Sequence, residues 1–150
     1  MIDGDELERS YKHHLSDYAE WEQRDHASNW MLIEDNLGEN LSIDETMLQE
    51  DLVTILSNKA GHCKQGSVIS IVRGTKAEDV IEVLMKIPEE ARLAVKEVTM
   101  DLSSSMRAIV STVFPNATIV LDCFHVLKRC HDAIEEVRLH LKRDAQVELR

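Results

Sequence analysis

The sequence predicts an α/β protein with one mixed sheet flanked by helices. Two observations lead to this fold class. Short apolar strands with short connections occupy residues 40–72, which is typical of an antiparallel meander. From residue 75 onward, apolar helical stripes alternate with single strands, and such helical crossovers imply parallel neighbours. With 150 residues, the chain has room for one ordinary domain.

Residues 1–35 are expected to form an acidic N-terminal helical segment. Leu7, Tyr11, Leu15 and Tyr18 fall roughly on one helical face, and no proline interrupts residues 5–30. We expect this helix to dock on the domain that follows it. Residues 36–150 are the expected core domain.

Five strands and three helices are expected in the core. The strands are residues 41–44, 52–56, 68–72, 95–100 and 118–121. Thr75 and Glu78 form a capping box before the first helix, which Pro88 closes. Ser103 can cap the second helix. A long third helix starts near Phe124 and runs close to the C-terminus.

Charge and composition restrict the function classes. Residues 1–50 carry 14 acidic and 3 basic side chains, so the whole formal charge of −11 lies there; residues 51–150 carry 14 of each sign. An acidic chain is an unfavourable partner for nucleic acid, because contacts to phosphates come from Lys and Arg. This objection applies here only to the N-terminal third. An acidic start, three cysteines and the lack of a long apolar stretch predict a cytoplasmic protein without a membrane span.

Three of the expected strands end on an aspartate: Asp44, Asp101 and Asp122. Carboxylates at neighbouring strand ends can converge and hold a hard divalent cation such as Mg²⁺ or Mn²⁺. Each aspartate also has a structural alternative. Asp101 and Asp122 precede helices and could be N-caps, while Asp44 could begin a turn with Glu45.

Four blocks surround these aspartates: NLSIDE at 40–45, VTMD at 98–101, FPNA at 114–117 and DCFHV at 122–126. In this order they resemble the catalytic region of bacterial insertion-sequence transposases of the DDE type, in the ISL3 group. The resemblance spans about residues 30–142. It implies a ribonuclease-H-like fold, Mg²⁺ or Mn²⁺ as cofactor, and DNA strand cleavage and strand transfer during transposition. It also implies transposon-end DNA as partner of the full-length enzyme and a possible homo-oligomer.

The resemblance assigns roles to particular residues. Asp44 and Asp101 would be the first two catalytic, metal-binding acids. Asp122 and His125 match the D-x-F-H block and would be second-rank site residues, with Cys123 where the family often has arginine.

The third acid of the family is usually a glutamate beyond a helical insertion. Its absence predicts a partial or truncated transposase that is inactive alone. One alternative third acid is Glu136, which follows Asp101 after 34 intervening residues. Another alternative is an inactive remnant or a subunit-interaction module.

A zinc site is less consistent with the sequence. Cys123, His125, Cys130 and His131 could be combined into one, as could His62 with Cys63. However, His125 and Cys130 are five residues apart, on diverging faces of a helix, and the chain has no C-x-x-C pair.

Overall fold

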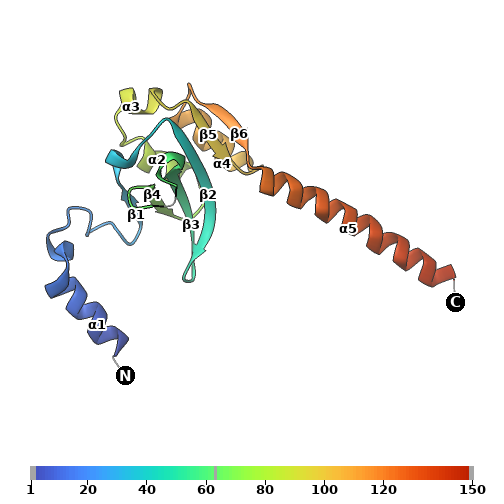
Figure 1. Cartoon of the computed structure of the whole chain (residues 1–150), viewed down its shortest axis with the longest axis horizontal. Coiled ribbons are helices and arrows are strands. Elements are labelled where there is room, and N and C mark those ends of the chain that lie inside the picture. Colours follow the sequence, from blue (N-terminus) through green and yellow to red (C-terminus); the bar gives the residue numbers. More distant parts are fainter. Residues whose placement is uncertain (1–2, 63, 149–150) are drawn as a thin grey trace.

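The computed structural model describes residues 3–62 and 64–148 and contains one six-stranded mixed sheet with helices packed against it (Figure 1). The strand order across the sheet is β1-β4-β3-β2-β5-β6. The strands are β1 Trp30–Leu32, β2 Asn40–Leu48, β3 Asp51–Asn58, β4 Val68–Arg73, β5 Glu97–Met100 and β6 Thr118–Leu121.

The direction of the strands changes in the middle of the sheet. Strands β2, β3 and β4 form an antiparallel meander, whereas β5 pairs in parallel with β2 and β6 in parallel with β5. The first strand of the meander therefore lies beside the first crossover strand, as the ribonuclease-H-like arrangement requires. The predicted fold class is confirmed.

One strand was missed by the sequence analysis. Strand β1 pairs antiparallel with β4 and lies within the segment that was expected to be helical, so the sheet has six strands and not five. Gln23 fixes this strand, because its side-chain amide donates to the Leu32 carbonyl at 2.5 Å and accepts from the Leu32 N–H at 2.7 Å. The His26 ring stacks on Trp30 with ring centroids 3.5 Å apart.

The helices are α1 Gly4–Ser10, α2 Ala77–Leu84, α3 Glu89–Leu93, α4 Ser104–Val113 and α5 Cys123–Glu148. The Ser103 cap is confirmed, since its hydroxyl accepts from the Met106 N–H at 3.4 Å. The capping box at Thr75 is wrong: Lys76 occupies the N-cap without a side-chain bond. The Thr75 carbonyl instead accepts from the Ser105 hydroxyl at 3.2 Å, which ties α2 to α4.

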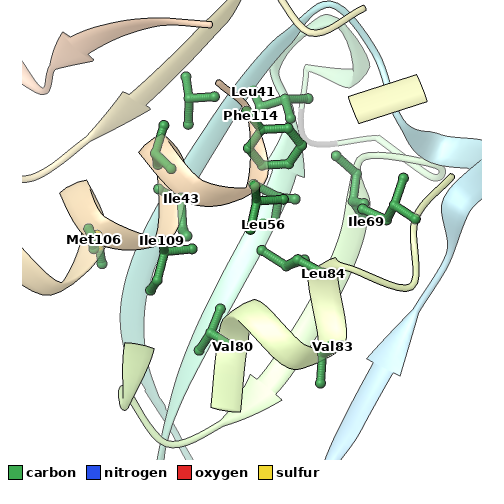
Figure 2. Close-up of a cluster of buried hydrophobic side chains, with 14 of the residues drawn as sticks. Leu41, Ile43, Leu56, Ile69, Val80, Val83, Leu84, Met106, Ile109 and Phe114 are labelled. Carbon is green, nitrogen blue, oxygen red and sulfur yellow. The ribbon is translucent and has the colours of Figure 1, made fainter. Parts of the chain in front are cut away.

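The hydrophobic core lies between the sheet and helices α2 and α4 (Figure 2). Alternate residues of β2, Leu41 and Ile43, point into it and are almost fully buried. Phe114, at the end of α4, is the largest of the fully buried side chains. Leu41 and Ile43 thus anchor β2 to the core through one face of the strand. Asp44, the next residue, lies on the opposite face.

The N-terminal helix does not dock on the sheet as expected. Helix α1 is followed by a π-helical turn, Tyr11–Leu15, and a 3₁₀ turn, Asp17–Glu20. Leu7, Tyr11 and Leu15 are all more than half exposed, and α1 lies apart from the sheet in Figure 1. The apolar spacing in this segment is too sparse to hold the helix against the core.

The predicted long C-terminal helix is confirmed as α5. It leaves the sheet directly after β6 and extends away from it as a single arm (Figure 1). Its residues are exposed along nearly the whole helix. Among the described residues, no helix combines the length and apolar composition required to cross a membrane.

Candidate active site

The three aspartates lie at the same level of the sheet: Asp101 and Asp122 directly follow β5 and β6, whereas the expected strand end at Asp44 is wrong, because β2 continues past it. The β2–β5 register pairs Ser42 with Thr99, so Asp44 and Asp101 each lie two residues further along. The β5–β6 register pairs Met100 with Leu121, so Asp101 and Asp122 each follow by one residue. Neighbouring strands are about 4.8 Å apart, so this register brings the three aspartates to one region.

Asp44 lies within a strand and not in a turn. Strand β2 continues beyond it to Leu48, and Asp44 pairs with Ile55 of β3. The turn alternative for Asp44 is therefore wrong. One carboxylate oxygen, Oδ1, accepts from the Glu45 N–H at 2.9 Å, and the side chain is exposed to solvent. A rigid, solvent-accessible carboxylate results.

Asp122 makes the N-cap contact that the structural alternative anticipated, whereas that alternative is wrong for Asp101, because Ser103 is the N-cap of α4. Asp101 Oδ1 accepts from the Ser103 N–H at 2.7 Å, just before α4. Asp122 Oδ1 accepts from the Phe124 N–H at 2.9 Å in the first turn of α5. These bonds use one oxygen of each carboxylate and fix its orientation. They do not involve the second oxygen, so these backbone contacts and a ligand role are compatible.

His125 lies beside Asp122 at the start of α5. Its Nε2 is 3.8 Å from Asp122 Oδ2, and its side chain is 31% exposed. The Asp122 N–H donates to the Met100 carbonyl at 2.8 Å, which joins this pair to the end of β5. Asp122 and His125 therefore border the Asp44–Asp101 region, at the junction between the sheet and the helical arm.

Glu45 is the site residue that the sequence analysis missed as a candidate. It follows Asp44 on β2 and is partly buried. Burial raises the pKa of the Glu45 carboxyl, and the negative charges of Asp101 and then Asp44 raise this pKa further. Glu45 is thus close enough to Asp101 and Asp44 for their charges to act on it. The sequence analysis ended this strand at Asp44, so alternation did not reach Glu45, which shares a face with Leu41 and Ile43 only because β2 continues.

Glu136 is not brought to this region. It lies on α5, 13 residues after the helix begins, which corresponds to about 20 Å along the helix axis. Figure 1 shows this helix extending away from the sheet. Within residues 3–62 and 64–148, no three His, Cys, Asp or Glu side chains converge on a point that could hold a metal ion. Cys63, considered above with His62, lies outside the described residues.

Comparison with known protein families identifies the family of this chain. The family model of a DDE transposase of the ISL3 type, described as "Transposase", matches residues 41–150. The chain belongs to the ISL3 family of DDE transposases. The match begins within β2 and includes Asp44, Asp101, Asp122 and His125. The resemblance inferred from the four sequence blocks is therefore confirmed.

This ISL3 transposase domain places the protein in DNA transposition and DNA recombination, and its family generally uses divalent metal ions. No curated protein sequence matches the chain. Among solved structures, it is similar to the catalytic core domain of BIV integrase. That similarity has 14% sequence identity and a TM-score of 0.42, and covers 71% of this chain and 72% of the integrase chain.

Proposed function

We propose that Asp44 and Asp101 hold a divalent cation, Mg²⁺ or Mn²⁺, for DNA strand cleavage and strand transfer. The observation that carries this proposal is their position at one level of two adjacent parallel strands. Both are hard oxygen donors, the ligand type that these cations prefer. Each has one carboxylate oxygen bonded to a backbone N–H, which orients the other.

The donor set also fits a cation electrostatically. Burial, and then the charges of Asp101 and Asp44, raise the pKa of Glu45, so negative charge is concentrated between the end of β5 and the middle of β2. A bound cation would neutralise this charge, and when bound it would stabilise charge on a scissile phosphate. The chain's own contribution is to hold the carboxylates on rigid strands and to leave Asp44 accessible to DNA.

Asp122 and His125 are proposed as second-rank residues that orient the ligands or the DNA. This role follows from their position, because the Asp122 N–H bonds to the Met100 carbonyl directly before Asp101. Groups that orient metal ligands commonly affect metal affinity without touching the metal. Glu136 is not included in the proposed ligand set, because α5 carries it away from the strands. Residues 36–150 are proposed as the transposase core.

Isothermal titration with Mn²⁺ tests the proposed ligands. Asp44→Asn and Asp101→Asn should each abolish Mn²⁺ binding, since each removes one charge from a two-carboxylate site. Asp132→Asn is the matched control, because Asp132 is an exposed aspartate on α5. Mn²⁺ affinity unchanged in both site variants would exclude this pair of ligands.

A further inference from the structure

The N-terminal segment contains a pocket that is separate from the Asp44–Asp101 site. Three aromatic rings, two carboxylates and one hydroxyl line it: Tyr11, Tyr18, Trp21, Asp17, Glu20 and Ser16. These residues belong to the π-helical turn Tyr11–Leu15, to the 3₁₀ turn Asp17–Glu20 and to the residues directly after each turn. The pocket has a volume of about 550 Å³. Small-molecule sites commonly measure about 300 to 1,000 Å³, so the pocket can hold a small ligand.

Hydrogen bonds join the backbone positions that carry the three rings. The Ser16 hydroxyl donates to the Tyr11 carbonyl at 2.9 Å and accepts from the Tyr18 N–H at 3.4 Å. The Trp21 N–H donates to the Tyr18 carbonyl at 3.4 Å, and the centroids of these two rings are 6.3 Å apart. Single π-helical turns are rare in proteins and frequently lie at functional sites. The three rings therefore belong to one hydrogen-bonded unit.

Tyr18 already attracts one cation in this segment. The face of an aromatic ring carries partial negative charge and attracts an ammonium group within about 6 Å of the ring centroid. Lys12 Nζ lies 5.2 Å from the centroid of Tyr18. Lys12 also pairs with Glu8 at 2.5 Å, and it is not among the residues that line the pocket. The turn thus contains one cation–π contact, and the pocket itself is open to a second cation.

The charge around the pocket also favours a cation. Asp17 and Glu20 contribute their carboxylates, and no basic side chain of the described residues lines the pocket. The pocket lies within residues 1–50, which carry 14 acidic and 3 basic side chains. This field attracts a cationic ligand and repels an anionic one, whereas a neutral ligand gains nothing from it.

A methylated ammonium group matches both the rings and the charge. A primary ammonium is strongly hydrated, and aromatic faces offer no acceptor atom to replace the water that its N–H groups lose. Methylation replaces those N–H groups with apolar surface and keeps the positive charge. Rings that surround such a group are the usual way in which proteins recognise it.

The second tryptophan of the chain provides an internal contrast. His26 stacks on the Trp30 ring with centroids 3.5 Å apart, and Lys86 Nζ lies 5.2 Å from the centroid of the same ring. Side chains of the protein itself therefore already contact the Trp30 ring. Trp21 instead lines the open pocket, so a cationic ligand should affect Trp21 and not Trp30.

We propose that Tyr11, Tyr18 and Trp21 form an aromatic cage that binds a methylated ammonium group. Asp17 and Glu20 supply the opposite charge. Choline and a trimethylated lysine side chain both carry this group, as a free small molecule and as part of a protein. The inference does not depend on the metal proposal, because none of the cage residues belongs to the Asp44–Asp101 site.

Nuclear magnetic resonance of the full chain tests the cage. The two tryptophans give two indole N–H signals in ¹H–¹⁵N spectra, and the Trp21 signal should shift and saturate while the Trp30 signal stays unchanged. Choline and a peptide with trimethyllysine are titrated separately. Saturation by choline identifies a free ligand as sufficient, and saturation by the peptide alone identifies a lysine side chain as the source. No saturable Trp21 shift up to about 10 mM of either ligand would overturn the proposal.

A neutral analogue and matched variants separate the cage from a merely apolar pocket. The alcohol 3,3-dimethylbutan-1-ol has the shape of choline without its charge and should not bind. Tyr18→Leu should weaken binding about 3- to 30-fold, the loss of one cation–π contact, whereas Tyr18→Phe keeps the ring and should bind like the wild type. Asp17→Asn should weaken binding most at low salt, and Asp35→Asn, at an exposed acid outside the pocket, is its control.

Two results from these comparisons would also overturn the proposal. One is binding of the neutral alcohol as tight as that of choline, and the other is unchanged affinity in Tyr18→Leu. An unshifted Trp30 indole signal and unchanged far-UV circular dichroism show that each variant is folded, so a loss of binding then reports on the pocket alone.

Discussion

Replacing Glu45 with glutamine should stabilise the protein at neutral pH. At this position the carboxylate is partly buried and lies close to the charges of Asp101 and Asp44, and all three effects raise its pKa. Glutamine has nearly the same shape without the charge. Each like-charge interaction near solvent costs about 0.2 to 0.5 kcal/mol, so removing two should add about 0.4 to 1 kcal/mol to the free energy of unfolding.

The stabilisation should depend on pH with a defined sign. The folded-state pKa of Glu45 is raised above its unfolded value, so the charged form disfavours folding. The penalty is complete above the folded-state pKa and disappears as the pH falls below the unfolded-state pKa, where both states bind the proton. The advantage of Glu45→Gln should therefore be largest near pH 7.5 and absent near pH 4.

Thermal unfolding followed by circular dichroism measures this effect. For a domain of this size, the expected gain corresponds to a rise of about 1 to 4 °C in Tm at pH 7.5. Glu50→Gln, at the exposed turn between β2 and β3, is the matched control and should show a smaller change. If Glu45→Gln lowered Tm, or raised it equally at pH 4 and 7.5, the proposed repulsion between the carboxylates of β2 and β5 would be wrong.

Three further predictions concern the core, the helical arm and the third acid. Phe114→Ala should lower the free energy of unfolding by about 3 to 5 kcal/mol in urea titrations, because the side chain is fully buried; a loss below 1 kcal/mol would contradict the core assignment. Asp122→Ala removes the acceptor for the Phe124 N–H and should cost about 1 kcal/mol, with a visible loss of helix signal at 222 nm; unchanged helicity would show that this cap is dispensable. Glu136→Gln should leave Mn²⁺ affinity unchanged in the titration that Asp44→Asn abolishes, and a clear loss of affinity would restore Glu136 as a ligand.

The sheet was largely predictable from local patterns. Alternation at Leu41 and Ile43, and the helical stripe that contains Ile109 and Val110, reflect burial on one side of each element. Strand β1 was missed because it is only three residues long and depends on Gln23, nine residues from its partner Leu32. A hydrogen bond between a side chain and the backbone nine residues away leaves no periodic pattern in the sequence.

The sequence indicated candidate residues for the site, but it did not indicate how the sheet arranges them. The blocks around Asp44 and Asp101 identified the family, and the register then brings these residues to one level. Neither the continuation of β2 past Asp44 nor the position of Glu45 followed from residue types alone. The end of β2 and the position of Glu45 both depend on how far β2 pairs with β3, and this pairing extends to Leu48 and Asp51.

The pairing between β2 and β5 ends early, and this affects how fast the backbone amides of β2 exchange hydrogen with solvent. Strand β2 pairs with β3 from Leu41 to Leu48 but with β5 only through Asn40, Leu41 and Ser42. From Ile43 onward, alternate amides of β2 therefore face the gap that opens where β5 turns away toward α4. These amides should exchange hydrogen with solvent faster than their neighbours that bond to β3. Asp44 thus lies on the part of β2 that β5 no longer covers.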